Sequence, residues 1–159
     1  MSFRIGTRDD LGTIFRIARH PAVKPTFGCG DEDDDWLMAK LGSTFQRFMY
    51  LIPDDNRAFF MLERMNDGGE DWSCHVAALP SARGYDLLQV GKGIKVWLKD
   101  SVGAERLWAW TTHDNRGARI FASWLVMKMS GNPGFCPWIY TDDEGVWMSV
   151  SLEECHVGR

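Results

Sequence analysis

The chain has 159 residues, of which 45 % are apolar, and this suits one domain with its own hydrophobic core, spanning residues 1–159. The formal net charge of −4 argues against broad binding to nucleic acid or to an anionic membrane surface, because both need a positive field. The start carries charge and lacks the apolar stretch of a signal peptide, and no apolar run is long enough to cross a membrane. We therefore expect a cytoplasmic protein.

The cysteines and tryptophans limit further what kind of protein this sequence can be. Cys29, Cys74, Cys136 and Cys155 form no C-x-x-C pair, and no histidine stands at zinc-ligand spacing from them. We expect free thiols in a reducing compartment and no metal site. Eight tryptophans in so short a chain imply a large buried aromatic area or a contact surface, and burial in the core is the usual outcome.

The first third of the chain predicts one strand and two helices. A short alternating segment at 3–7 is followed by a helical pattern at 9–20, whose apolar face carries Leu11, Ile14, Phe15 and Ala18. A second helix is expected from near Asp33 to about Phe48, with Leu37, Leu41 and Phe45 on its apolar face. The acidic run 31–35 is interpreted as a solvated loop leading into that helix, where the helix dipole favours carboxylates.

The middle of the chain predicts three strands and a long helix. The segments 48–53, 57–65 and 71–79 are typical of strands, and the turn signals between them indicate an antiparallel meander. From Gly84 to Asp100 the pattern favours one long helix with Leu87, Gly91 and Ile94 on its apolar face and Tyr85 widening it. The alternative is a loop to Gly93 and a very short helix.

The last third predicts a strand at 105–112, a helix at 115–129 and a hairpin around the turn at 142–145. The helix is expected to be capped by Asp114 or Asn115 and to bury a face that includes Phe121 and Trp124. The predicted order is β-α-α-β-β-β-α-β-α-β-β. This is an α/β fold with a mixed, mostly antiparallel sheet of six or seven strands and helices on both faces.

This order, together with particular residues, resembles the GCN5-related N-acetyltransferase (GNAT) superfamily. The resemblance is clearest from Cys74 to Phe135, where the strand "CHVAALP" is followed by Arg83-Gly84, a crossover helix, a strand, and a helix opened by Asn115. The chain is similar in this respect to small acetyltransferase-like proteins of bacteria and phages. The resemblance implies that the strands near Val76 and Leu107 are parallel neighbours that diverge at their C-terminal ends.

The resemblance also implies a site for acetyl-CoA and an amine substrate. The pantetheine arm would pair with the backbone of Val76, Ala77, Ala78 and Leu79. The pyrophosphate would lie on amides at the start of the crossover helix, near Arg83, Gly84 and Tyr85, with Asn115 near the thioester. A solvated Arg83 in an ordinary strand-to-helix connection is the alternative for that stretch.

Two residues are candidates for the base that takes the proton from the amine. The first is His75, because the ordinary histidine pKa suits proton transfer near neutral pH, and the second is Glu63, which would act through water. A histidine that only makes structural hydrogen bonds is the alternative interpretation of His75.

A second function remains open from the sequence, namely a binding or assembly protein that keeps the GNAT fold without its chemistry. A phage virion component or a phage-encoded inhibitor of a host protein would fit, with an aromatic patch contacting the protein partner. Three sequence features favour it, and the first is the tryptophan-rich composition. The loop glycines that the family has after Gly84 are missing, and Ala122 stands where many members have a tyrosine that protonates the leaving thiolate.

Overall fold

The computed structural model describes residues 2–27, 33–65, 70–127 and 138–152 of the chain. It divides into two compact units that alternate along the sequence. We call Met1–Glu63 with His75–Val90 the N-terminal unit, and Arg64–Cys74 with Gly91–Arg159 the C-terminal unit.

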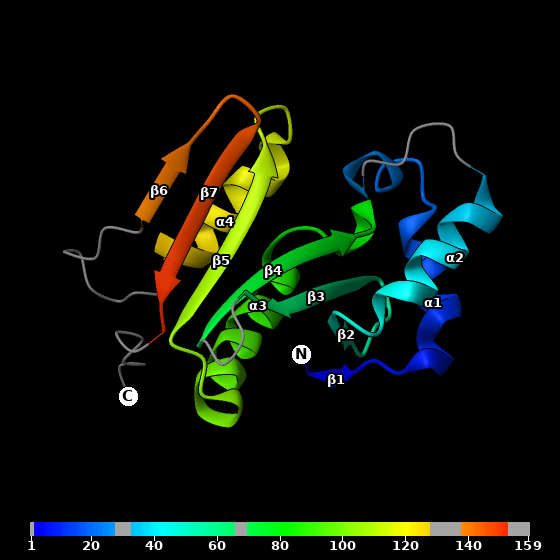
Figure 1. Cartoon of the computed structure of the whole chain (residues 1–159), viewed down its shortest axis with the longest axis horizontal. Coiled ribbons are helices and arrows are strands. Elements are labelled where there is room, and N and C mark those ends of the chain that lie inside the picture. The colour runs from blue at the N-terminus through cyan, green and yellow to red at the C-terminus, as the bar shows by residue number, and fades with distance from the viewer. Residues whose placement is uncertain (1, 28–32, 66–69, 128–137, 153–159) are drawn as a thin grey trace. The chain divides into compact units, whose positions relative to one another are not determined.

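The strands and helices follow the predicted order, and the sheet is mixed and mostly antiparallel, as expected (Figure 1). Its seven strands are ordered β1-β2-β3-β4-β5-β7-β6. The strands are β1 (Phe3–Ile5), β2 (Met49–Pro53), β3 (Ala58–Arg64), β4 (Asp71–Ala78), β5 (Arg106–Thr112), β6 (Trp138–Thr141) and β7 (Gly145–Ser151). The α-helices are α1 (Leu11–Ala18), α2 (Asp34–Thr44), α3 (Tyr85–Trp97) and α4 (Arg116–Met127).

Short helical turns join these elements. They are the 3-10 turns η1 (Arg8–Asp10), η2 (Lys24–Phe27) and η3 (Pro80–Ala82), and the π-helical turn η4 (Leu98–Val102) that continues α3. No helix in the described ranges is long and apolar enough to cross a membrane.

The N-terminal unit packs α1 and α2 on one face of its strands. β1 pairs antiparallel with β2, and β2 pairs antiparallel with β3. The core between strands and helices is built from the predicted helix faces and from alternate strand residues, which point to one side of the sheet. Its buried members are Ile14, Ile17, Ala18, Val23, Leu37, Leu41, Tyr50, Ile52, Phe59, Met61 and Ala77.

The start of α2 confirms part of the interpretation of the acidic run. The Asp33 side chain accepts a hydrogen bond of 2.8 Å from the Trp36 backbone N–H and so caps the helix. Asp34, in the first turn, lies 3.1 Å from the Arg19 guanidinium at the end of α1. The rest of the run, residues 31 and 32, lies outside the described residues.

The C-terminal unit contains the parallel pair of the sheet. Asp71, Trp72 and Ser73 of β4 pair with Arg106, Leu107 and Trp108 of β5, which confirms the predicted parallel neighbours. β5 pairs antiparallel with β7, and β7 with β6, so that the final hairpin is also confirmed.

One helix of the C-terminal unit departs from its predicted face. Ala122 is buried on α4, and the Ser123 hydroxyl lies 3.9 Å from the Met148 sulfur of β7, so this side of the helix faces the strands. Trp124 is 45 % exposed, and its prediction as a buried residue was wrong. At 100° per residue, Phe121, Ala122 and Leu125 define the packed face, and position 124 falls to its side.

The long-helix interpretation of α3 is correct, because helical structure runs from Tyr85 to Trp97 and continues through η4. Gly91 has a packing role there, since an added Cβ would lie 2.7 Å from a methyl carbon of Leu125 on α4. Tyr85 does not widen the apolar face of α3, because it is 71 % exposed in the first turn.

Candidate functional site

The second half of β4 carries the backbone on which the cofactor was predicted to bind. Ala77 points into the core of the N-terminal unit, whereas Val76 and Ala78 are partly exposed on the alternate face. The strand ends where the Leu79 N–H donates a 2.9 Å hydrogen bond to the Arg57 carbonyl. Of the residues predicted for the pantetheine arm, Val76, Ala77 and Ala78 end strand β4, and Leu79 follows it directly.

The loop after β4 presents backbone amides at the start of α3. The 3-10 turn η3 leads to Gly84, whose φ of 111° is a conformation that residues with a Cβ rarely adopt. Helical hydrogen bonding begins with Leu88, whose N–H donates to the Gly84 carbonyl at 3.2 Å. The amides of Tyr85, Asp86 and Leu87 precede that bond, as they do at any helix start, and suit an anion.

Arg83 is held against its own loop. Its Nε donates to the Ala78 carbonyl at 3.3 Å, and one terminal nitrogen donates to the Ala22 carbonyl at 3.1 Å. The side chain therefore ties the end of β4 to the turn between α1 and η2. It is more than a solvated residue of an ordinary connection, and it sits one residue before the glycine that opens α3.

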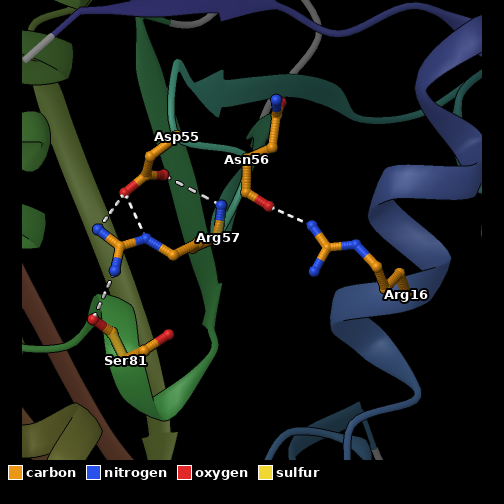
Figure 2. Close-up of polar contacts among 5 residues, drawn as sticks. All are labelled: Arg16, Asp55, Asn56, Arg57 and Ser81. Atoms are coloured by element: carbon orange, nitrogen blue, oxygen red, sulfur yellow. Dashed lines mark hydrogen bonds and ion pairs between the residues drawn. The ribbon is translucent and has the colours of Figure 1, made fainter.

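A second arginine supports the same loop from the turn between β2 and β3 (Figure 2). Arg57 makes an ion pair of 2.8 Å with Asp55, and its other terminal nitrogen donates to the Ser81 carbonyl at 3.0 Å. On the other side of the turn, Arg16 of α1 donates to the Asn56 carbonyl at 2.5 Å. The turn signal in this segment was recognised from the sequence, but the role of Arg57 was not. Its hydrogen-bond acceptor, the Ser81 carbonyl, lies 24 residues further along the chain and leaves no local pattern.

The two predicted bases lie on one face of the N-terminal unit. Glu63 alternates with Phe59 and Met61 along β3, and His75 alternates with Ala77 along β4, so both follow the side that faces the core helices. The His75 ring packs edge-on against Phe48, with 6.2 Å between ring centroids.

Arg47 completes this group and was not predicted. Its Nε donates to a carboxylate oxygen of Glu63, and its guanidinium lies over the Phe48 ring, 5.3 Å from the ring centroid, as in a cation–π contact. Although His75 is exposed on one side, desolvation by the surrounding protein lowers its pKa. The Glu63 carboxylate acts in the opposite direction and Arg47 reinforces the lowering, so the imidazole is neutral at neutral pH and can accept a proton.

The neighbouring thiol has the opposite character. Burial raises the pKa of Cys74 to about 12, so the group remains a protonated thiol under ordinary conditions. Adjacent strand residues point to opposite faces, which separates Cys74 from His75, as the sequence indicated. Cys29, Cys136 and Cys155 lie outside the described residues.

Asn115 belongs to the C-terminal unit and caps α4. Its side-chain oxygen accepts a 3.0 Å hydrogen bond from the Ala118 backbone N–H, which confirms the predicted cap. Within the ranges that the structure describes, no group of three or more His, Cys, Asp or Glu side chains is arranged to hold a metal ion.

Comparison with solved structures shows that the chain has the fold of GNAT acetyltransferases. A mutant of the spermidine N-acetyltransferase SpeG from Vibrio cholerae superimposes with a TM-score of 0.70 at 11 % identity, covering 99 % of this chain and 98 % of that one. The same enzyme in complex with CoA and spermine gives a TM-score of 0.67 at 12 % identity, covering 96 % of each chain.

A second kind of protein shares the fold to the same extent. AAC(6')-Ib in complex with paromomycin and acetyl-CoA gives a TM-score of 0.73 at 10 % identity, covering 99 % of this chain and 97 % of that one. No family model and no curated protein matches the sequence. The likeness is therefore one of fold, over nearly the whole chain, and the acetyltransferase fold predicted from the sequence is confirmed.

Proposed function

We propose that the chain is an N-acetyltransferase that moves an acetyl group from acetyl-CoA to an amine. The observation that carries the proposal is the fold, which is shared over 96 % or more of the chain with acetyltransferase structures that hold CoA or acetyl-CoA. The loop after β4, with Gly84 at a φ of 111° and the α3 amides behind it, supports the proposal, because backbone amides at a helix start favour an anion such as a pyrophosphate.

In this proposal the strand and loop hold the cofactor. The backbone of Val76, Ala77, Ala78 and Leu79 pairs with the pantetheine arm, and the pyrophosphate lies on the amides from Gly84 to Leu87. Arg83 flanks those amides, and Asn115 lies near the thioester. Most of the rate enhancement then comes from holding the amine and the thioester together in the reactive orientation.

The chemical step needs one proton acceptor. The amine nitrogen attacks the thioester carbonyl, a C–N bond forms, and the C–S bond breaks to release the CoA thiolate. Neutral His75 takes the proton that the nitrogen loses, directly or through a water held by Glu63. Because Ala122 replaces the family's tyrosine, the thiolate is protonated by solvent or by His75 in its charged form.

The amine is proposed to be a small polar molecule with a primary amino group. The structures that share the fold were determined with spermine and with paromomycin, which both carry more than one such group. A cytoplasmic location follows from the proposal, because reduced thiols and the thioester donor belong to that compartment.

The test is acetyl transfer from acetyl-CoA to a panel that contains spermidine, spermine, paromomycin and single amino acids, followed by mass spectrometry of the products. We expect at least one amine to gain one acetyl group per free thiol released. The His75→Gln variant is the matched control and should lose most of that transfer while still binding CoA. An unmodified panel, with thiol release at the rate of the enzyme-free solution, would argue against this proposal.

The alternative is a GNAT-fold protein that serves as a binding module. Ala122 and the acidic Asp86 in the first turn of α3 favour it, because neither helps the chemistry or the binding of a pyrophosphate. It predicts that CoA does not bind and that His75→Gln has no effect on any binding activity. The aromatic partner surface that this alternative needs stays a prediction, and Trp36 on α2 is the exposed tryptophan of the described part of the N-terminal unit.

A further inference from the structure

Arginines of two other elements hold the turn between β2 and β3, and Figure 2 shows one of them, Arg16 of α1. Asn56, at the centre of the turn, has a φ of 54°, and its side-chain oxygen accepts a 3.0 Å hydrogen bond from Arg4 of β1. Its carbonyl accepts from Arg16 on the α1 side. Since the backbone and a side chain of the same residue are both held, the turn is a fixed support rather than a loose tip.

Arg57 connects this support to the loop after β4 at two points. Its carbonyl accepts the Leu79 N–H at 2.9 Å, and its side chain donates to the Ser81 carbonyl at 3.0 Å. These two contacts lie on either side of Pro80, the first residue of η3. They fix the path of the chain immediately before the Gly84 turn and the start of α3.

Asp55 holds the Arg57 side chain in the orientation that reaches Ser81. One carboxylate oxygen lies 2.9 Å from Nε and 2.8 Å from a terminal nitrogen of Arg57, so it accepts from two neighbouring donors of the guanidinium, and such charge-assisted hydrogen bonds are strong. The other carboxylate oxygen accepts the Arg57 backbone N–H at 3.0 Å. The remaining terminal nitrogen is thereby directed to the Ser81 carbonyl.

We propose that Arg57, oriented by Asp55, is a positioning residue for the pyrophosphate loop of the acetyl-CoA site. It does not touch the cofactor. It sets the path of residues 79–84 and so aims the amides that follow Gly84 at one anion position. This inference rests on the proposed function for the identity of the anion, whereas the bracing of the loop is a property of the free protein.

Two variants on the same turn separate this role from general stability. Arg57→Gln removes the link to Ser81 and to Asp55, and Arg16→Gln removes a guanidinium contact to the same turn from the α1 side. Both changes remove one positive charge and one arginine-to-carbonyl hydrogen bond. Of these two side chains, only that of Arg57 directly contacts the segment that leads into α3.

The first measurement is hydrogen exchange of the free protein, read at the amides of residues 79–88. We expect exchange in this segment to quicken about tenfold in Arg57→Gln and in Asp55→Asn, and to be unchanged in Arg16→Gln. The double variant Arg57→Gln/Asp55→Asn should exchange no faster than Arg57→Gln alone, because Asp55 acts on the loop only by orienting the Arg57 side chain toward Ser81. Unchanged exchange in Arg57→Gln would overturn the proposal, whatever the protein binds.

The second measurement is the affinity for CoA and for S-acetyl-pantetheine, which lacks the pyrophosphate. In Arg57→Gln we expect the Kd for CoA to rise about tenfold, the scale of one lost charge-assisted contact, with little change for S-acetyl-pantetheine. An equal loss for both ligands, or the same loss in Arg16→Gln, would contradict a role at the pyrophosphate. If the parent binds neither ligand, the proposed function fails and with it the assignment of the anion, and the exchange experiment alone then decides whether Arg57 braces the loop.

Discussion

His75 is the residue on which the proposed chemistry depends most. Desolvation and the charge of Arg47 lower the pKa of His75, whereas the charge of Glu63 raises it. The net effect is a lowered pKa. The imidazole is therefore an acceptor at neutral pH. The side chains beside His75 are open to solvent, since Arg47 is 70 % exposed and Glu63 is 21 % exposed. Water can therefore exchange protons with this cluster of side chains.

The pH dependence of acetyl transfer should report this balance. In the parent, kcat/KM should rise with pH through an apparent pKa below the ordinary histidine value of about 6.5, because only neutral His75 accepts the proton. Arg47→Gln removes a nearby positive charge, so the limb should move to higher pH. A pH-rate profile of both proteins checks this, and a limb that stays in place would disconnect Arg47 from the base.

His75 and Glu63 could be proposed as bases from the sequence because each is of a common base type and stands on a recognisable strand, and their catalytic role stays a prediction. Arg47 and Arg57 were missed for a shared reason. An arginine at a helix end or in a turn has no local pattern that tells whether it is solvated or bound, and here the partners lie 16 and 24 residues away. Trp124 was misplaced because an aromatic ring at the edge of an apolar helix face satisfies the same spacing as a buried one.

At the scale of elements, the connection from β4 to α3 contains the features that the proposed binding of acetyl-CoA needs. The strand ends at a backbone hydrogen bond to Arg57, the 3-10 turn reverses the chain, and Gly84 adopts a φ that favours glycine. Sequence reasoning predicted the strand, the turn and the helix. It did not predict that Arg83 folds back onto Ala78 and Ala22, because those acceptors are backbone carbonyls.

Arg83→Glu tests this connection as an anion site. The substituted carboxylate would oppose a pyrophosphate and compete for the amides at the start of α3, while the contacts to Ala78 and Ala22 would be lost. We expect CoA binding to weaken by at least ~1–2 kcal/mol in a calorimetric titration. The control Arg8→Glu makes the same charge change on η1 and should bind CoA as the parent does. If Arg83→Glu also bound CoA with the affinity of the parent, the pyrophosphate would not lie beside Arg83.

The contact between β5 and β7 offers a test of the C-terminal unit that is independent of function. An added Cβ at Gly145 would lie 2.5 Å from the Thr111 carbonyl oxygen and 2.9 Å from the Trp110 ring, and backbone cannot yield cheaply there. Gly145→Ala should lower the free energy of unfolding by about 1–3 kcal/mol or more. Gly12→Ala on α1, where nothing lies within 4 Å, should raise it by up to about 1 kcal/mol.

Denaturant unfolding of the two alanine variants gives both values. A neutral Gly145→Ala would mean that the β5–β7 pair approaches less closely than described. A destabilising Gly12→Ala would mean that the α1 surface at that position is covered in solution.

For the whole molecule, the order of elements was predictable because hydrophobic periodicity and turn signals are local. The parallel pairing of β4 with β5 followed from the family resemblance and is confirmed for Asp71–Ser73 with Arg106–Trp108. The division into two compact units was not foreseen, since both units are assembled from segments that are distant in sequence. The expectation of a single domain over residues 1–159 stays a prediction.

The fold is shared with acetyltransferases of different substrates at 10–12 % identity, so it does not identify the amine. The proposed function requires one particular donor, acetyl-CoA, whichever amine is the substrate. Binding of the donor is therefore the property that separates an acetyltransferase from a protein that has kept only the architecture.

Calorimetric titration of the purified chain with acetyl-CoA tests that central claim most directly. We expect saturable binding of one acetyl-CoA per chain. CoA should compete for the same site, and Arg83→Glu should weaken the binding. A chain that is folded by circular dichroism but gives no binding heat at millimolar acetyl-CoA, at two temperatures, would contradict the account.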